Sequence, residues 1–124
     1  MIQNRFGEFI VKRRKEKKIT LRGMADKLDL SPAYWSDIEK GRRNPPNIEK
    51  LHEIAVILNL LPEEENEMID LASLDRDEIP MDLPQYIKDS SLAQAALRKA
   101  KNMDNKSVTE KAWKDFIKTL EDNE

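Results

Sequence analysis

The sequence predicts an all-α fold, with a five-helix domain over residues 1–75 and a helical C-terminal extension over residues 76–124. Apolar residues recur three and four positions apart in one segment after another, which places them on one face of a helix. Residues that favour helix starts, such as Ser, Asn and Pro, stand directly before several of these segments. A chain of 124 residues can bury one compact core, so a domain with an appendage fits its length better than two full domains.

The first helix is indicated by Phe6, Phe9 and Ile10, which share one helical face. This face leads into a run of mostly basic residues at positions 12–18. Cations at the end of a helix complement the negative end of its dipole and commonly form a solvated face. We therefore expect the basic run to lie on the surface, with a phosphate-binding patch as the alternative.

Residues 19–45 indicate two short helices joined by a tight turn and followed by a basic loop. The first of these helices presents an apolar face formed by Leu21, Met24, Ala25 and Leu28. Asp29 and Leu30 make the turn, where aspartate tolerates a left-handed backbone better than most residues. Ser31 then supplies an N-cap oxygen, and Pro32 takes the first helical position, where its missing N–H costs nothing.

The second helix of the pair, residues 32–40, is expected to bury Trp35 and Ile38 and to stop at Gly41, which suits the left-handed position after a helix. Its opposite face is mostly small and polar, and a basic loop follows it. The run SPAYWSDIEKGRRNP, residues 31–45, resembles the XRE helix-turn-helix family of phage-repressor-like DNA-binding regulators. The resemblance extends to about residue 61 and thins out after it.

This resemblance implies a sequence-specific transcriptional regulator, a repressor that binds a two-fold operator in double-stranded DNA as a homodimer. The helix over residues 32–40 would lie in the major groove, where Ala33, Ser36 and Asp37 would approach base edges. Residues at the starts of both helices and in the basic loop would contact phosphates. The full predicted set of DNA-binding residues is Thr20, Arg22, Ser31, Pro32, Ala33, Tyr34, Ser36, Asp37, Lys40, Arg42, Arg43 and Asn44.

The predicted base-reading face differs from that of family members with glutamine-rich recognition helices, because Pro32, Ala33 and Asp37 stand at the matching places. Bidentate readout of adenine by glutamine is therefore absent there. Ala33 could touch a thymine methyl group, and Asp37 could accept from a cytosine amino group. Asp37 could equally orient Arg42 or Arg43, since a carboxylate close to phosphates needs a cation beside it.

Charge is divided unevenly along the chain, although the net charge is only −2. Residues 1–61 hold 13 Lys and Arg against 8 Asp and Glu, a net charge of +5. Residues 62–124 hold 9 Lys and Arg against 16 Asp and Glu, a net charge of −7. A positive module gains from neutralising phosphates and releasing counterions, so the split favours a DNA-binding head followed by an acidic tail.

Two more helices complete the predicted domain. Asn47 can cap a helix over residues 48–58, and Pro62 opens another with three glutamates, residues 63–65, in its first turn. The predicted core-facing residues of these two helices are Leu51, Ile54, Ala55, Ile57, Leu58, Met68, Leu71 and Ala72. Acids beside a helix N-terminus are stabilised by the helix dipole, so the glutamates do not indicate a metal site, and no metal is expected.

The predicted extension begins after a linker at residues 74–84, which combines acidic residues with two prolines. A short helix near residues 85–88 and a helix of small residues over about residues 92–101 follow. Ser107 and Glu110 match a capping box that would start the last helix. The apolar side of that helix is formed by Val108, Ala112, Trp113, Phe116, Ile117 and Leu120.

Three kinds of surface could cover this apolar side: another part of the same chain, a second copy in a homodimer, or a different protein. Members of the resembling family of this size also serve as antitoxins that dock a toxin through the tail. The alternative function is therefore a DNA-binding antitoxin whose C-terminal extension binds the toxin. A stable complex with the product of a neighbouring gene would distinguish this alternative.

Enzymes, cofactor-dependent proteins and membrane proteins are not expected. His52 is the only histidine and lies in a predicted helix without a nucleophile pattern around it. The three glycines are scattered and form no phosphate loop, and the absence of cysteine removes disulfides and thiolate zinc sites. No apolar run is long enough to span a bilayer, and the N-terminal charges follow the apolar stretch, unlike in a secretory signal, so a cytoplasmic location is expected.

Overall fold

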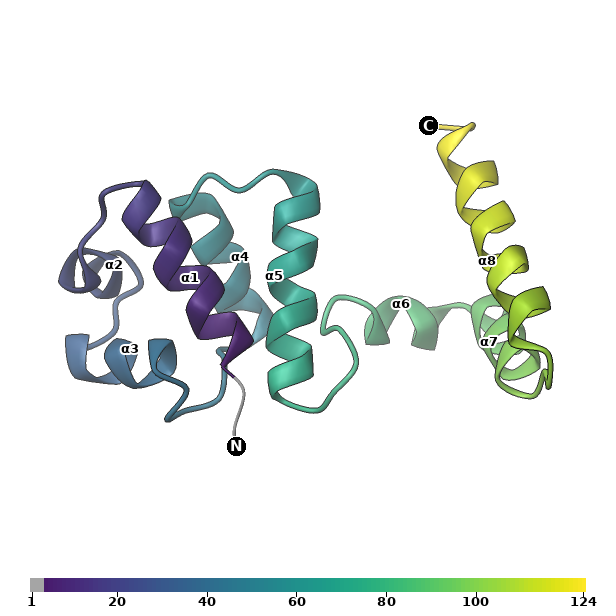
Figure 1. Ribbon diagram of the computed structural model, residues 1–124, viewed down its shortest axis with the longest axis horizontal. Helices are drawn as coiled ribbons and strands as arrows, with labels where there is room; N and C mark the ends of the chain where they lie inside the picture. Colours follow the sequence, from purple (N-terminus) through teal and green to yellow (C-terminus); the bar gives the residue numbers. More distant parts are fainter. Residues whose placement is uncertain (1–3) are drawn as a thin grey trace. The chain divides into compact units, whose positions relative to one another are not determined.

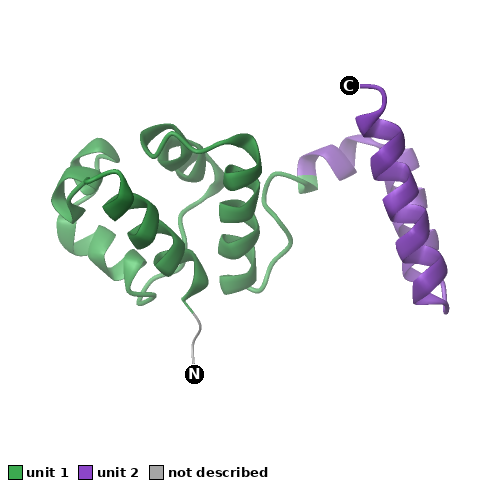
Figure 2. Cartoon of the chain, turned by 45° about the horizontal axis from the view of Figure 1, so that its top comes forward, with its two compact units in different colours: residues 1–84 green, residues 85–124 purple. Residues whose placement is uncertain are grey.

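The computed structural model describes residues 4–124 and is helical throughout between its loops, as the sequence predicts (Figure 1). The chain divides into two compact units, residues 1–84 and residues 85–124 (Figure 2). The first unit contains α1 (Arg5–Glu16), α2 (Leu21–Lys27), α3 (Pro32–Glu39), α4 (Ile48–Ile57) and α5 (Pro62–Asp75). The second unit begins within α6 (Pro84–Asp89) and contains α7 (Ser91–Lys101) and α8 (Lys106–Glu121).

Side-chain caps fix the helix starts of the first unit where the sequence predicts them. Thr20, Ser31 and Asn47 each accept the backbone N–H three residues further on, at 2.9, 3.1 and 3.0 Å respectively. α5 starts at Pro62, and the Glu64 carboxylate accepts the preceding N–H of the N-cap residue at 2.8 Å. Because a cap stabilises a helix by about 1 kcal/mol, the starts of these helices are determined locally.

A residue with a left-handed backbone conformation follows each of the helices α2 and α3. Asp29 has a φ of 57° after α2, and Gly41 has a φ of 78° after α3. Glycine carries no steric penalty in this region of φ and ψ, and aspartate carries a smaller one than most residues. Both predicted left-handed positions are confirmed, and the turn between α2 and α3 has the expected local chemistry.

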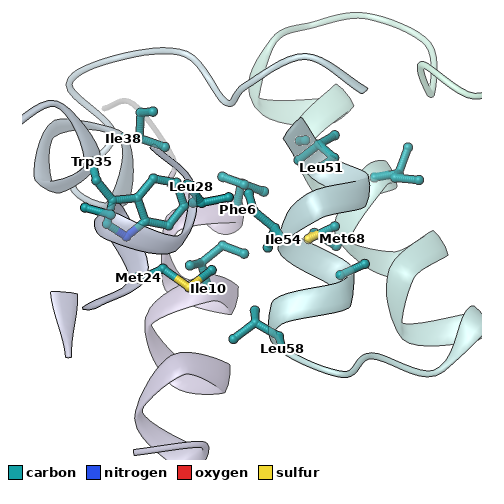
Figure 3. Close-up of a cluster of buried hydrophobic side chains, with 14 residues drawn as sticks. Phe6, Ile10, Met24, Leu28, Trp35, Ile38, Leu51, Ile54, Leu58 and Met68 are labelled. Carbon is teal, nitrogen blue, oxygen red and sulfur yellow. The ribbon is translucent and has the colours of Figure 1, made fainter. Parts of the chain in front are cut away.

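The hydrophobic core of the first unit draws side chains from all five of its helices (Figure 3). Trp35 is completely buried, and α1 packs against both α3 and α5, so the first helix joins the two sides of the unit. The predicted core faces of α2, α3 and α4 are confirmed except for Leu21 and Ile57, which are partly buried. In α5, Met68 and Ala72 are buried as predicted, whereas Leu71 is only partly buried. Each large apolar side chain buried in this way contributes about 1.5–3 kcal/mol.

A close approach of backbones joins α1 to the end of α3. A Cβ atom added at Gly7 would lie 2.1 Å from the carbonyl oxygen of Glu39, which is far inside van der Waals contact. The Asn4 side chain donates to the same carbonyl at 2.7 Å. Only glycine at position 7 permits this approach, so the sequence uses it to bring the two helices together.

A buried ion pair fixes the same two helices further along. Arg14 donates from Nε and Nη2 to the two carboxylate oxygens of Glu39, at 2.8 and 3.0 Å, and from Nη1 to the carbonyl of Ile19 at 3.0 Å. The two side chains are only 9% and 4% exposed. A buried pair needs this fork geometry and further hydrogen bonds to offset the desolvation of its charges.

Two predicted boundaries near the end of the chain are wrong. α5 continues through Asp75, so the predicted linker begins inside a helix, and the Asp75 carboxylate accepts the N–H of Phe6 at 2.9 Å. α8 starts at Lys106 with Asn105 as its cap, which accepts from Ser107 and Val108 at 3.0 and 3.4 Å. The predicted capping box does not form, because asparagine is as good a cap as serine and stands two residues earlier.

The excess of acidic residues does not lie in the C-terminal extension, where an acidic tail was predicted. Residues 62–84 hold 9 Asp and Glu against a single basic residue, whereas residues 85–124 hold 7 Asp and Glu against 8 Lys and Arg. The acidic segment is therefore α5 and the loop after it, which belong to the first unit. The second unit is close to neutral.

We expect Gly7→Ala to lower the free energy of unfolding by about 1–3 kcal/mol, because the added methyl group would push α1 away from α3. Urea unfolding followed by circular dichroism measures the change. Gly23→Ala is the matched control, since its Cβ would meet only side chains, at 3.0 Å or more, and alanine favours the helix. Equal stability of the two variants would contradict the close approach at Gly7.

Glu39→Gln is expected to destabilise the protein by about 3–5 kcal/mol, because it leaves the Arg14 charge buried without a partner. The exposed Glu49→Gln is the control for the same chemical change and should alter stability by less than about 0.5 kcal/mol. Thermal and urea unfolding of both variants provide the measurement. A loss of stability no larger than that of the control would show that the pair is not needed.

Candidate nucleic-acid interface

α3 buries one face and leaves the other accessible, as its spacing predicts. Trp35, Ile38 and Glu39 are buried, whereas Ala33 and Tyr34 are exposed. The other predicted contact residues of α3, Pro32, Ser36 and Asp37, are partly exposed. The outward face is thus narrow and carries mainly small side chains, which allows a helix backbone to come close to another surface.

The starts of α2 and α3 are both open to solvent. The caps Thr20 and Ser31 are exposed, and so is Arg22 in the first turn of α2. The first N–H groups of a helix have no partner within the helix and carry partial positive charge, so such a start favours an anion. Pro32 at the first position of α3 has no N–H, so the groups that remain come from the residues after it.

The loop after α3 holds two arginines against the helix. The guanidinium of Arg43 lies over the Tyr34 ring, 4.8 Å from its centroid. Asp37 lies 3.6 Å from Arg42 and 3.8 Å from Arg43, measured between carboxylate oxygen and guanidinium nitrogen. The arginine side chains are still 67% and 56% exposed, so their charge faces solvent. Of the two roles left open for Asp37, this geometry favours orientation of the arginines.

A polar hollow of about 550 Å³ collects the residues of this loop. Its lining consists of Tyr34, Arg42, Arg43, Asn44, Pro45, Pro46, Asn47 and Arg76. The structure thus brings four predicted contact residues together around one space, while Thr20, Arg22 and Ala33 lie outside its lining. A hollow lined by three guanidinium groups and two amides can hold a phosphate oxygen by charge and by hydrogen bonds.

Arg76 is the lining residue that sequence reasoning missed. It follows α5, and its Nη1 donates to the carbonyl of Pro45 at 2.5 Å, which braces the loop after α3. Its Nε lies 3.4 Å from the Glu78 carboxylate. The signal in the sequence was that Arg76 is the single basic residue within the acidic stretch of residues 62–84.

Residues 5–68 match the model of a family described as a helix-turn-helix domain, which covers more than half of the chain. The chain belongs to the helix-turn-helix domain family. No curated protein and no solved structure matches it. The match includes α1 to α4 and the first half of α5, so the hollow beside α3 lies within the helix-turn-helix domain except for Arg76. Membership of this family supports a DNA-binding regulator.

The two arginines of the basic run in α1 join this helix to other helices of the helix-turn-helix domain. Arg13 forms an ion pair with Glu64 at 2.5 Å and lies over the Phe9 ring at 5.2 Å, and Arg14 is the buried partner of Glu39. Lysines of the run are exposed. The predicted solvated face is therefore formed by the lysines, whereas the arginines join α1 to α5 and α3.

The structure also bears on His52, on metal binding and on membrane insertion. His52 is exposed, with its Nδ1 2.5 Å from the Glu65 carboxylate. Within residues 4–124, no group of three or more His, Asp or Glu side chains is placed to hold a metal ion. No helix in the described part of the chain combines the length and the apolar character that crossing a bilayer requires.

We expect Arg76→Gln to weaken DNA binding and to lower the slope of log affinity against log salt concentration by about one unit, because one of the three guanidinium groups that line the hollow is removed. Fluorescence anisotropy with labelled DNA at several salt concentrations measures both effects. Arg98→Gln is the matched control, since this arginine lies in the second unit. An unchanged slope for Arg76→Gln would limit this residue to bracing the loop at Pro45.

Proposed function

We propose that the protein is a sequence-specific transcriptional regulator of the XRE type, a repressor that binds a two-fold operator in double-stranded DNA as a homodimer. The recognition helix is α3 together with Lys40. The observation that carries this proposal is the accessible face of α3 between two groups that are able to bind phosphate, the open helix start at Ser31 and the arginine loop at residues 42–44.

The phosphate ligands at the two ends of α3 would set its position in the major groove. Ser31 and the N–H groups of the first turn would bind a phosphate at one end, and Arg42 and Arg43 would do so at the other, since all of them are exposed or open to solvent. Thr20 and Arg22 at the start of α2 add a further contact to the same backbone. Such contacts fix register and orientation but carry no sequence information.

Base recognition then falls to the small side chains of α3. Ala33 can touch a thymine methyl group, and Ser36 can donate to or accept from a base edge. Asp37 lies beside two arginines, which supports a role in placing them over a role in reading cytosine. Discrimination by each such contact is about 1–3 kcal/mol at most, so sequence-dependent DNA shape would contribute to specificity as well.

Selection of bound fragments from random and genomic DNA tests the proposal. The expected result is an enriched inverted repeat whose half-sites are about one helical turn apart, since two recognition helices of a dimer must enter successive major grooves on one side of the duplex. Enrichment of a single unrepeated site would contradict the two-fold operator. No enrichment at any salt concentration would contradict sequence-specific binding.

Arg42→Ala together with Arg43→Ala should weaken binding to all DNA sequences and lower the salt slope by about one to two units. The matched control is Lys15→Ala together with Lys17→Ala, which removes the same charge from exposed positions near the end of α1. Titrations of the enriched site and of random DNA at several salt concentrations compare the two. Equal salt slopes for the two double variants would show that the arginine loop does not contact DNA.

A further inference from the structure

The turn that ends α5 sets the position of Arg76 and of the acidic residue two places after it. Asp77 has a left-handed backbone with a φ of 56°, and its N–H donates to the carbonyl of Leu74 at 3.1 Å. The N–H of Glu78 donates to the carbonyl of Ser73 at 2.9 Å. These two bonds form a Schellman motif. Because the motif uses backbone atoms only, the turn does not depend on the side chain of Glu78.

The carboxylate of Glu78 lies beside the charge of Arg76 without fixing it. One of its oxygens is 3.4 Å from Nε of Arg76, and that Nε has no hydrogen-bond partner among the described residues. The side chain of Glu78 is 52% exposed. Such a half-exposed ion pair contributes little to stability, and its carboxylate is free to turn into solvent. The contact is therefore easily exchanged for one with another anion.

The buried pair of the same unit shows the difference between a fixed contact and an exchangeable one. Arg14 makes two hydrogen bonds to the carboxylate of Glu39, and the two side chains are only 9% and 4% exposed. Arg76 is held instead by a separate hydrogen bond, from Nη1 to the carbonyl of Pro45. Its guanidinium therefore stays in place when the carboxylate of Glu78 leaves, and it can bind a new anion without being reoriented.

Carboxylates of the chain itself offset most of the positive charge of the hollow. Its guanidinium groups belong to Arg42, Arg43 and Arg76. Asp37 lies 3.6 and 3.8 Å from the first two, and Glu78 lies 3.4 Å from the third. Three guanidinium groups against two carboxylates leave one net positive charge. Glu78 lies outside α3 and outside the matched residues 5–68, so it can be substituted without altering the recognition helix.

We propose that Glu78 competes with a DNA phosphate for Arg76 and so lowers the affinity of the hollow for any duplex. A phosphate in the hollow would pair with Arg76, and the side chain of Glu78 would turn into solvent while its backbone stays in the turn. The charge-assisted hydrogen bonds that guanidinium groups offer a phosphate are stronger than the contact that is lost. This inference rests on the proposed function, since it requires that the hollow contact DNA.

Fluorescence anisotropy of the full chain with a labelled random duplex, in salt of about 0.1 M, tests the competition. Glu78→Gln should lower the dissociation constant about two- to fivefold, as expected for the loss of a half-exposed ion pair.

Asp77→Asn is the matched control. It removes the same charge from the preceding residue, which is exposed and forms no salt bridge within residues 4–124, and asparagine also tolerates the left-handed backbone. The control should tighten binding less than Glu78→Gln does. Equal changes would overturn the proposal. Weaker binding by Glu78→Gln would also overturn it, because Glu78 would then hold Arg76 in place for DNA.

A double-mutant cycle with Arg76→Gln shows whether the effect passes through Arg76. In the Arg76→Gln chain, the gain from Glu78→Gln should fall to that of Asp77→Asn, because the carboxylate then has no cation for which to compete. A gain of undiminished size would overturn the proposal. Circular dichroism checks that each variant is folded. The comparison of Glu78→Gln with Asp77→Asn needs no change at Arg76, so it decides the matter even where Arg76→Gln unfolds the chain.

The inference and the proposed function can fail separately, because phosphate contacts carry no sequence information and a random duplex is enough for this test. Tighter binding by Glu78→Gln that depends on Arg76, together with no enriched sequence, would leave the inference standing and overturn the sequence-specific regulator. An enriched operator that Glu78→Gln binds no more tightly than the natural chain would overturn the inference alone. No binding of the natural chain to any duplex at low salt would overturn both.

Discussion

The buried pair of Arg14 and Glu39 is the constraint on which the geometry of the first unit depends. It joins α1 to the last residue of α3 within a few ångströms of the Gly7 approach, so the same stretch of α3 is held by charge, by a hydrogen bond from Asn4 and by backbone contact. A helix held so firmly at its end cannot roll about its axis without breaking a desolvated ion pair. The outward face of α3 is therefore fixed in direction by contacts on its inward side.

Arginine is used in two distinct ways in this unit. Arg13 and Arg14 pair with carboxylates of other helices, whereas Arg42 and Arg43 share one carboxylate, Asp37, and keep most of their surface in solvent. The fork geometry of guanidinium suits both uses, because it satisfies a carboxylate inside the protein and a phosphate outside it equally well. The lysines at the end of α1 and just after it are exposed. Glu64 of the acidic α5 pairs with Arg13 of α1. The acidic charge of α5 therefore balances basic residues of the same unit and does not form a separate tail.

The sequence was most informative where structure is decided locally. The caps at Ser31 and Asn47 and the left-handed Asp29 follow from a few neighbouring residues, and the burial of Trp35 follows from helical spacing. Pairings between distant residues could not be predicted, because no local rule couples Arg14 to a residue 25 positions away or Arg76 to a carbonyl 31 positions away. The start of α8 was missed for another reason, since Asn105 and Ser107 are both good caps and the local sequence does not decide between them. The outward face of α3 was thus predictable residue by residue, and the hollow beside it was not.

The carboxylate of Asp37 has a further consequence for how a protein of this kind finds its target. It offsets one of the two arginine charges before any nucleic acid is bound, so the attraction to an arbitrary stretch of duplex is weaker than the count of basic side chains suggests. Under the proposed function, residence at wrong sites would become shorter, while a correct site would still compensate through its base contacts. Because random sequence outnumbers operators by about a millionfold or more in a genome, a single acidic residue beside these arginines would then shorten the search.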